Sequence, residues 1–170
     1  VSKTPAIFSP IERRHILAKI APKAHQYVFF SYIKYFSINH FFNKEVYLET
    51  NFKAVIGKDT EVLVFAGIAN PSLLEDFVRS NSKAYKLITF EDHHSFTSSD
   101  LNQIKEEFDA LRGTKKIILT TEKDAMRLLP LNLFSEWSNL PLFFISIAVQ
   151  MHQQDEEKFN NLILNYVRTN

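Results

Sequence analysis

The chain has 170 residues, of which 45% are hydrophobic and 23% are charged. This composition is typical of a globular protein and excludes a disordered or fibrous one. The absence of cysteine excludes a disulfide scaffold and a thiolate metal site. Because Lys and Arg exceed Asp and Glu by only one, giving a formal net charge of +1, no global field attracts the protein to nucleic acid, and we expect no nucleic-acid partner.

The first predicted element is a helix that begins after Ser9. Ser9 can cap it, Pro10 occupies the first helical position, and Glu12 completes a capping box. Pro22 is expected to end it.

The segment after this helix has a weaker pattern. Residues 27–33 are rich in aromatic and β-branched side chains, which favours a strand, and residues 46–48 and 52–56 are typical of two short strands of a ribbon. We therefore interpret residues 1–60 as a helix, a strand and a linker or ribbon that joins a domain outside this chain.

From residue 61 onward, short apolar runs alternate with segments of helical periodicity. The predicted strands are 62–66, 84–90, 116–120 and 142–148, and the predicted helices start near residues 70, 98, 121 and 155. Such alternation indicates an α/β fold, with a mostly parallel sheet and helices on both faces in three layers. Residues 61–170 are the predicted C-terminal α/β domain.

In a parallel sheet, ligands bind outside the carboxyl ends of the strands, so the loops that follow strands are the candidate sites. The first such loop is 67–71, in which Gly67 permits a tight turn and Asn70 precedes the next helix. A well-capped helix start explains the same residues.

The second loop contains Asp92, His93 and His94. A carboxylate beside an imidazole can hold one tautomer and can raise the pKa, which suits proton transfer or the orientation of another acid. The alternative is that Asp92 caps a turn and the histidines are solvated.

The third loop contains Thr121, Glu122, Lys123 and Asp124. Thr121 and Asp124 fit a capping box, and acidic side chains are favourable in a first helical turn. Lys123 is not explained by capping, and we expect it to meet an anion or a carboxylate across a cleft.

Two other classes of function remain open on the residues alone. A manganese-dependent phosphoesterase could use an Asp-His-His loop, but no Asp-x-Asp pair accompanies it, and neighbouring side chains diverge, so we predict no metal site in this chain. A non-catalytic α/β interaction module would need the three loops only as helix caps.

Six stretches, in order, carry a resemblance to a known family. They are VSKTP at 1–5, FSPIERR at 8–14, VFFSYIKY at 28–35, VLVFAGIANP at 62–71, FEDHHSFTSSDL at 90–101 and ILTTEKDAMRL at 118–128. Their order and spacing agree along nearly the whole chain. Together they resemble the C-terminal half of the tetraacyldisaccharide 4'-kinases, the lipid A 4'-kinases of Gram-negative bacteria.

The resemblance implies transfer of the ATP γ-phosphate, with Mg²⁺, to the 4'-hydroxyl of a tetraacyldisaccharide 1-phosphate lipid. It places on His93 the histidine that orients the catalytic aspartate of the N-terminal domain. Asp92 and His94 would support His93. Asn70 and residues 121–124 would line the substrate and nucleotide cleft.

The N-terminal P-loop domain of such kinases has no counterpart here. The three glycines, Gly57, Gly67 and Gly113, form no Gly-x-x-x-x-Gly-Lys-[Ser/Thr] loop. Val1 is therefore interpreted as an internal boundary of a longer protein. We expect the chain alone to be inactive, with no bound ATP or Mg²⁺, and to reach the cytoplasmic face of the inner membrane through the other half.

Overall fold

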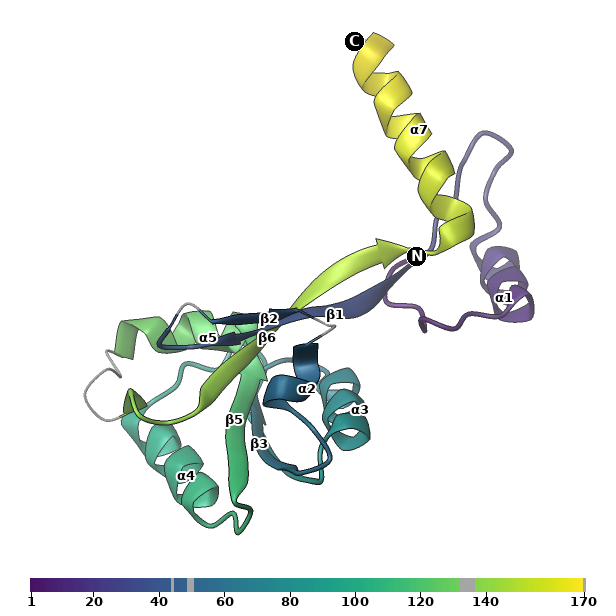
Figure 1. The fold of residues 1–170 in the computed structure, drawn as a ribbon. Helices are drawn as coiled ribbons and strands as arrows, with labels where there is room; N and C mark the ends of the chain where they lie inside the picture. Colours follow the sequence, from purple (N-terminus) through teal and green to yellow (C-terminus); the bar gives the residue numbers. More distant parts are fainter. Residues whose placement is uncertain (44, 49–50, 132–136, 170) are drawn as a thin grey trace. The chain divides into compact units, whose positions relative to one another are not determined.

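The computed structural model describes residues 1–43, 45–48, 51–131 and 137–169. Its contacts divide the chain into two compact units (Figure 1). Unit 1 comprises Val1–Lys34 together with Ile147–Asn170, and unit 2 comprises Tyr35–Ser146.

Within the described residues, six strands form one mixed sheet in the order β2-β1-β6-β5-β3-β4. Their bounds are β1 Ser31–His40, β2 Val46–Leu48, β3 Thr60–Ala66, β4 Ala84–Thr89, β5 Lys115–Thr121 and β6 Leu142–Met151. The pairs β3–β4, β3–β5 and β5–β6 are parallel, whereas β1 and β2 are antiparallel. The predicted α/β class with a mostly parallel sheet is confirmed.

Strand β3 pairs with β5 on one side and with β4 on the other, and its side chains alternate between two apolar clusters. Val62, Val64 and Ala66 belong to one cluster, and Leu63 and Phe65 to the other. Both faces of the strand are therefore covered, as its continuous apolar run predicts.

Helices contribute buried side chains to both of these clusters. Helices α2 (Phe52–Val55) and α3 (Ser72–Asn81) supply buried side chains to the first cluster. Helices α4 (Ser98–Asp109) and α5 (Glu122–Leu128) supply them to the second. A short 3₁₀ turn, η2 (Leu129–Leu131), follows α5. Helices thus cover both faces of the sheet.

The prediction of a strand at residues 52–56 is wrong, because residues Phe52–Val55 form helix α2. Phe52 and Val55 are three residues apart, so one helical turn buries both against the same face of the sheet. The Phe52 ring also meets the Phe77 ring of α3 at 5.8 Å, edge to face. Packing outweighs the local strand preference here.

The strand predicted at residues 27–33 begins later, at Ser31, and continues to His40. Phe30 shows why. Its backbone N–H donates to the Asp155 carboxylate at 2.9 Å, and its carbonyl accepts from the backbone N–H of His152 at 3.1 Å. These contacts replace regular strand pairing at the entrance to β1.

Unit 1 contains α1 (Pro10–Ile20), capped as predicted by Ser9 and Glu12, and α7 (Gln153–Thr169). Much of the apolar stripe of α7 is exposed rather than packed. Its exposed apolar side chains are Leu162, Ile163, Leu164, Tyr166 and Val167, which are 39–69% exposed. Among the described residues, no helix is both long enough and apolar enough to cross a membrane.

A buried ion pair joins α1 to α7 within unit 1. Arg13 donates to both carboxylate oxygens of Asp155, at 2.7 and 2.6 Å, and Asp155 is only 5% exposed. Burial by itself raises the pKa of Asp155, but the hydrogen bonds from Arg13 and the Phe30 N–H, and the charge of Arg13, outweigh it. The pKa of Asp155 is therefore held below its ordinary value.

This depressed pKa predicts a loss of stability in acid. A carboxyl whose folded-state pKa is lowered stabilises the fold above its unfolded-state pKa and loses that contribution as the pH falls through the folded value. We therefore expect the free energy of unfolding, from urea denaturation followed by circular dichroism, to fall below a pH of about 4. Asp155→Asn is expected to be less stable at neutral pH and to show a shallower acid dependence. Asp109→Asn, which changes an exposed carboxylate, is the control. If the free energy of unfolding falls with pH equally steeply in wild type and Asp155→Asn, the low pKa of Asp155 is not the cause of the acid dependence.

Candidate functional site

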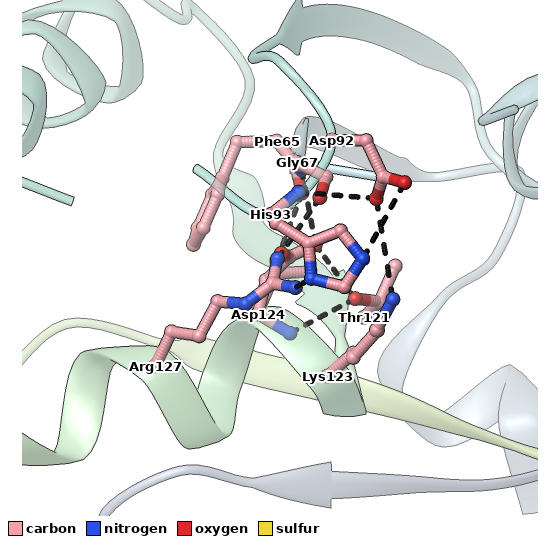
Figure 2. Close-up of polar contacts among 9 residues, drawn as sticks. Phe65, Gly67, Asp92, His93, Thr121, Lys123, Asp124 and Arg127 are labelled. Atoms are coloured by element: carbon pink, nitrogen blue, oxygen red, sulfur yellow. Dashed lines mark hydrogen bonds and ion pairs between the residues drawn. The ribbon is translucent and has the colours of Figure 1, made fainter. Parts of the chain in front are cut away.

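The three predicted loops follow β3, β4 and β5, which are neighbouring parallel strands, and the structure brings them together (Figure 2). The backbone N–H of Gly67 donates to Asp124 Oδ2 at 3.1 Å, which joins the first loop to the third. The Lys123 ammonium lies 4.0 Å from Asp92 Oδ1, which joins the third loop to the second. The carboxyl edge of the sheet therefore carries one polar cluster.

Asp124 is the buried centre of this cluster, with no exposed surface. Its Oδ2 accepts from the Gly67 N–H and from the Thr121 hydroxyl at 2.7 Å, while the Asp124 N–H donates back to Thr121 Oγ1 at 3.1 Å. Thr121 is the N-cap of α5, as predicted. The carboxylate thus ties the start of α5 to the loop after β3.

Gly67 allows this close approach. A Cβ atom at this position would lie 3.2 Å from Asp124 Oδ1, 3.3 Å from the Glu91 carbonyl oxygen and 3.3 Å from His94 Cβ. These distances are tighter than about nine in ten real Cβ contacts, so a side chain here would push its neighbours by a few tenths of an ångström. Glycine is therefore favoured at this position by space, since its backbone does not adopt a positive φ.

Arg127 extends the cluster to the second loop. One guanidinium nitrogen, Nη1, donates to the Gly67 carbonyl at 2.9 Å and to Asp124 Oδ1 at 2.8 Å. The other, Nη2, lies 3.2 Å from His93 Nδ1. Arg127 therefore contacts all three loops, and its side chain is only 20% exposed.

His93 protrudes from the second loop. Its backbone has φ 63°, in the left-handed region that non-glycine residues adopt infrequently. Its side chain is 72% exposed, and Nε2 lies 3.6 Å from Asp92 Oδ2. The loop is closed behind it by a hydrogen bond from the His94 N–H to the Glu91 carbonyl at 3.1 Å. The imidazole is therefore accessible, with both ring nitrogens facing charged groups.

His94 points to a different set of partners. Its ring stacks on Phe90, with centroids 4.7 Å apart, and its Nε2 lies 3.0 Å from Asp100 Oδ2. Burial alone raises the pKa of Asp100, but the hydrogen bonds from His94 and Thr97 lower it to below its ordinary value. Thr97 and Asp100 form the capping box of α4, so the N-cap is Thr97 and the helix begins at Ser98, near the predicted start. His94 is thus anchored to the start of α4.

The other predicted site residues lie at the periphery. The Asn70 side chain accepts from the Ser72 N–H at 3.0 Å, next to Pro71, the N-cap of α3. Glu122 is exposed in the first turn of α5. Arg127 was not predicted. The available signal was its position three residues after Asp124 on a helix, where opposite charges pair.

The described residues contain no group of three or more His, Cys, Asp or Glu side chains that could hold a metal ion. His93 and His94 have different partners and do not converge. In the part of the chain that the structure describes, the donors therefore do not form a Mg²⁺ site.

Fold and site together define an α/β domain with a basic and imidazole-bearing site at the carboxyl edge of its parallel strands. The family model for Tetraacyldisaccharide-1-P 4'-kinase matches residues 13–168. The chain belongs to this kinase family.

Relatives are similar along the whole chain. It is 32% identical to a tetraacyldisaccharide 4'-kinase of Bacteroides thetaiotaomicron, over 100% of this chain and 46% of that protein. It is 34% identical to the protein of the same name in Parabacteroides distasonis, over 99% of this chain and 45% of that protein. The chain thus spans a little under half the length of these curated relatives.

One solved structure is also similar, a crystal structure of the "apo" form of the Aquifex aeolicus protein of this family in complex with ATP. It is 18% identical, with a TM-score of 0.48, over 85% of this chain and 38% of that one.

Proposed function

We propose that this chain is the C-terminal part of a kinase that transfers the γ-phosphate of ATP to the 4'-hydroxyl of a tetraacyldisaccharide 1-phosphate lipid. The family relationship along nearly the whole chain supports this class of reaction. The observation that carries the proposal is the placement of His93, an exposed imidazole held at the carboxyl edge of the sheet by Arg127.

His93 would orient and polarise a carboxylate of the other half, which in turn accepts the proton of the sugar hydroxyl. Phosphoryl transfer depends mainly on positioning and charge stabilisation, so a fixed imidazole suits this task. Asp92 lies beside the imidazole and Lys123 lies beside Asp92, and their charges would influence the electrostatic potential at His93. His94 supports the loop from the start of α4.

ATP and Mg²⁺ belong to the complete enzyme in this proposal, and their binding groups lie outside the residues described here. The supporting observation is compositional, since the three glycines of this chain form no phosphate-binding loop. We assign the phosphate-binding loop to a P-loop domain in the remaining part of the relatives' length. The partners are then this domain and the lipid substrate.

The exposed apolar face of α7 supports a domain partner. Its side chains are up to 69% exposed within unit 1, and covering such surface is favourable by about 25 cal/mol per Å². We assign this face to packing against the P-loop domain. In the complete enzyme, the same domain would bring the site to the cytoplasmic face of the inner membrane, where the lipid lies.

The test is a kinase assay with γ-labelled ATP and tetraacyldisaccharide 1-phosphate. The complete protein is expected to label the lipid at the 4'-position, and the 170-residue chain alone is expected to give no turnover. Its circular dichroism spectrum verifies that the isolated chain is folded in that assay. Turnover by the chain alone contradicts the division of the site between two domains, and no labelling by the complete protein contradicts the activity.

A further inference from the structure

The environment of His93 Nδ1 determines which ring nitrogen carries the proton. A guanidinium group has five N–H donors and no acceptor, and it stays protonated in proteins. The contact of Arg127 Nη2 with His93 Nδ1 at 3.2 Å is therefore a hydrogen bond only if Nδ1 accepts. Neutral His93 must then carry its proton on Nε2.

Arg127 is held firmly enough to impose this choice. Its Nη1 is bound to the Gly67 carbonyl and to the buried Asp124, so two hydrogen bonds fix the planar guanidinium before Nη2 reaches His93. Asp124 is itself held by Thr121 and by the Gly67 N–H. Figure 2 shows the resulting chain of contacts, from the buried carboxylate through the guanidinium to the exposed imidazole.

Among the residues that the structure describes, the Nε2–H of His93 has no acceptor at ordinary hydrogen-bond distance. The nearest ion-pair partner, Asp92 Oδ2, is 3.6 Å away, which is longer than an ordinary hydrogen bond. Asp92 is also drawn toward Lys123, 4.0 Å from its other oxygen. The proton on Nε2 is therefore available to a second carboxylate that approaches the exposed ring.

We propose that Arg127 is a positioning residue that fixes His93 as its Nε2–H tautomer, so that Nε2 donates to the carboxylate that accepts the sugar hydroxyl proton. This inference rests on the proposed function for its catalytic consequence, but the tautomer follows from the geometry of this chain alone. Two hydrogen bonds define this arrangement. Arg127 donates to Nδ1, and Nε2–H donates to the incoming carboxylate.

The first measurement is a proton–nitrogen NMR correlation of the histidine ring nitrogens in the ¹⁵N-labelled 170-residue chain. It is made at a pH of about 8.5, where imidazole is neutral. The His93 signals are identified by their loss in His93→Ala. We expect a protonated Nε2 and an unprotonated Nδ1 in wild type, and a mixture of tautomers in Arg127→Met. A proton on Nδ1 of wild-type His93 overturns the inference, whatever the variants do.

The second measurement is turnover of the complete protein. Arg127→Met is expected to lower kcat by about 10- to 100-fold, by analogy with the loss seen when the hydrogen-bond partner of a metal-bound histidine is removed. The KM for ATP is expected to stay unchanged. Arg127→Lys, which keeps a donor, should recover part of kcat. Arg79→Met, which removes an exposed arginine of α3 bound to Glu75, is the matched control and should keep wild-type turnover.

The outcomes separate the two proposals. If His93→Ala abolishes turnover but Arg127→Met has wild-type kcat, the inference fails and the proposed function stands. If the wild-type tautomer is Nε2–H but neither His93→Ala nor Arg127→Met changes kcat, the proposed role of His93 in catalysis fails and the catalytic consequence of the inference fails with it, whereas the kinase activity itself is contradicted only if the wild-type protein does not label the lipid. If Arg127→Met does not fold, the wild-type tautomer and Arg127→Lys decide the question.

Discussion

Replacing His93 by alanine in the complete protein is expected to lower kcat for phosphorylation of the lipid by about 100-fold or more, the usual range for groups that assist proton transfer. The side chain is 72% exposed, so the fold should remain intact. The KM for ATP should change little, because His93 is proposed to act on the hydroxyl acceptor. Steady-state kinetics with varied ATP and lipid measure both quantities.

The control for this variant is His25→Ala, which removes an exposed histidine of unit 1. It should have wild-type kcat and KM. Equal thermal stability of wild type and His93→Ala establishes that lost turnover reflects chemistry rather than unfolding. Wild-type kcat in His93→Ala would reject the role of this imidazole.

Asp124→Ala is expected to give the largest loss of stability, about 3–5 kcal/mol of unfolding free energy. Asp124 has no exposed surface, and its removal leaves the Gly67 N–H without its acceptor and the Arg127 guanidinium without its carboxylate partner. An unpaired buried donor or charge has lost its hydration without compensation. Urea denaturation of the 170-residue chain, followed by Trp137 fluorescence within unit 2, measures this change.

The matched control is Asp76→Ala. Asp76 also pairs with an arginine three residues further along a helix, Arg79, but its side chain is 65% exposed. Exposed pairs contribute about 1 kcal/mol or less, so this variant should be nearly as stable as wild type. If both variants lose the same amount of stability, burial of Asp124 is not the cause.

The sequence predicted secondary structure correctly where the residues that determine an element lie within a few positions of one another. The capping box of Ser9 and Glu12 predicts the start of α1, and the apolar run from Val62 predicts β3, because capping and burial on two faces are encoded over a few residues. The prediction of a strand at residues 52–56 failed because the conformation of these residues depends on packing against the sheet and against Phe77 of α3. A strand propensity of a few residues is weaker than such packing.

The same distinction applies to the candidate site. The rule that loops after parallel strands meet at one edge predicts that the loops come together and that Lys123 meets an anion or a carboxylate there, and the structure places Lys123 4.0 Å from the Asp92 carboxylate. Arg127 escaped this reasoning because it lies one turn inside α5 rather than in a loop. That Asp124 turns inward to the Gly67 N–H depends on how tightly two loops approach, which no single loop reveals.

Because Gly67 has no side chain, three other segments of the chain can lie close to its backbone. An added methyl group would press at once on Asp124, on the Glu91 carbonyl and on the base of His94. The missing side chain thereby lets the buried carboxylate of Asp124 and the loop that carries His94 lie close together, and Arg127 binds both the Gly67 carbonyl and Asp124 at the same place.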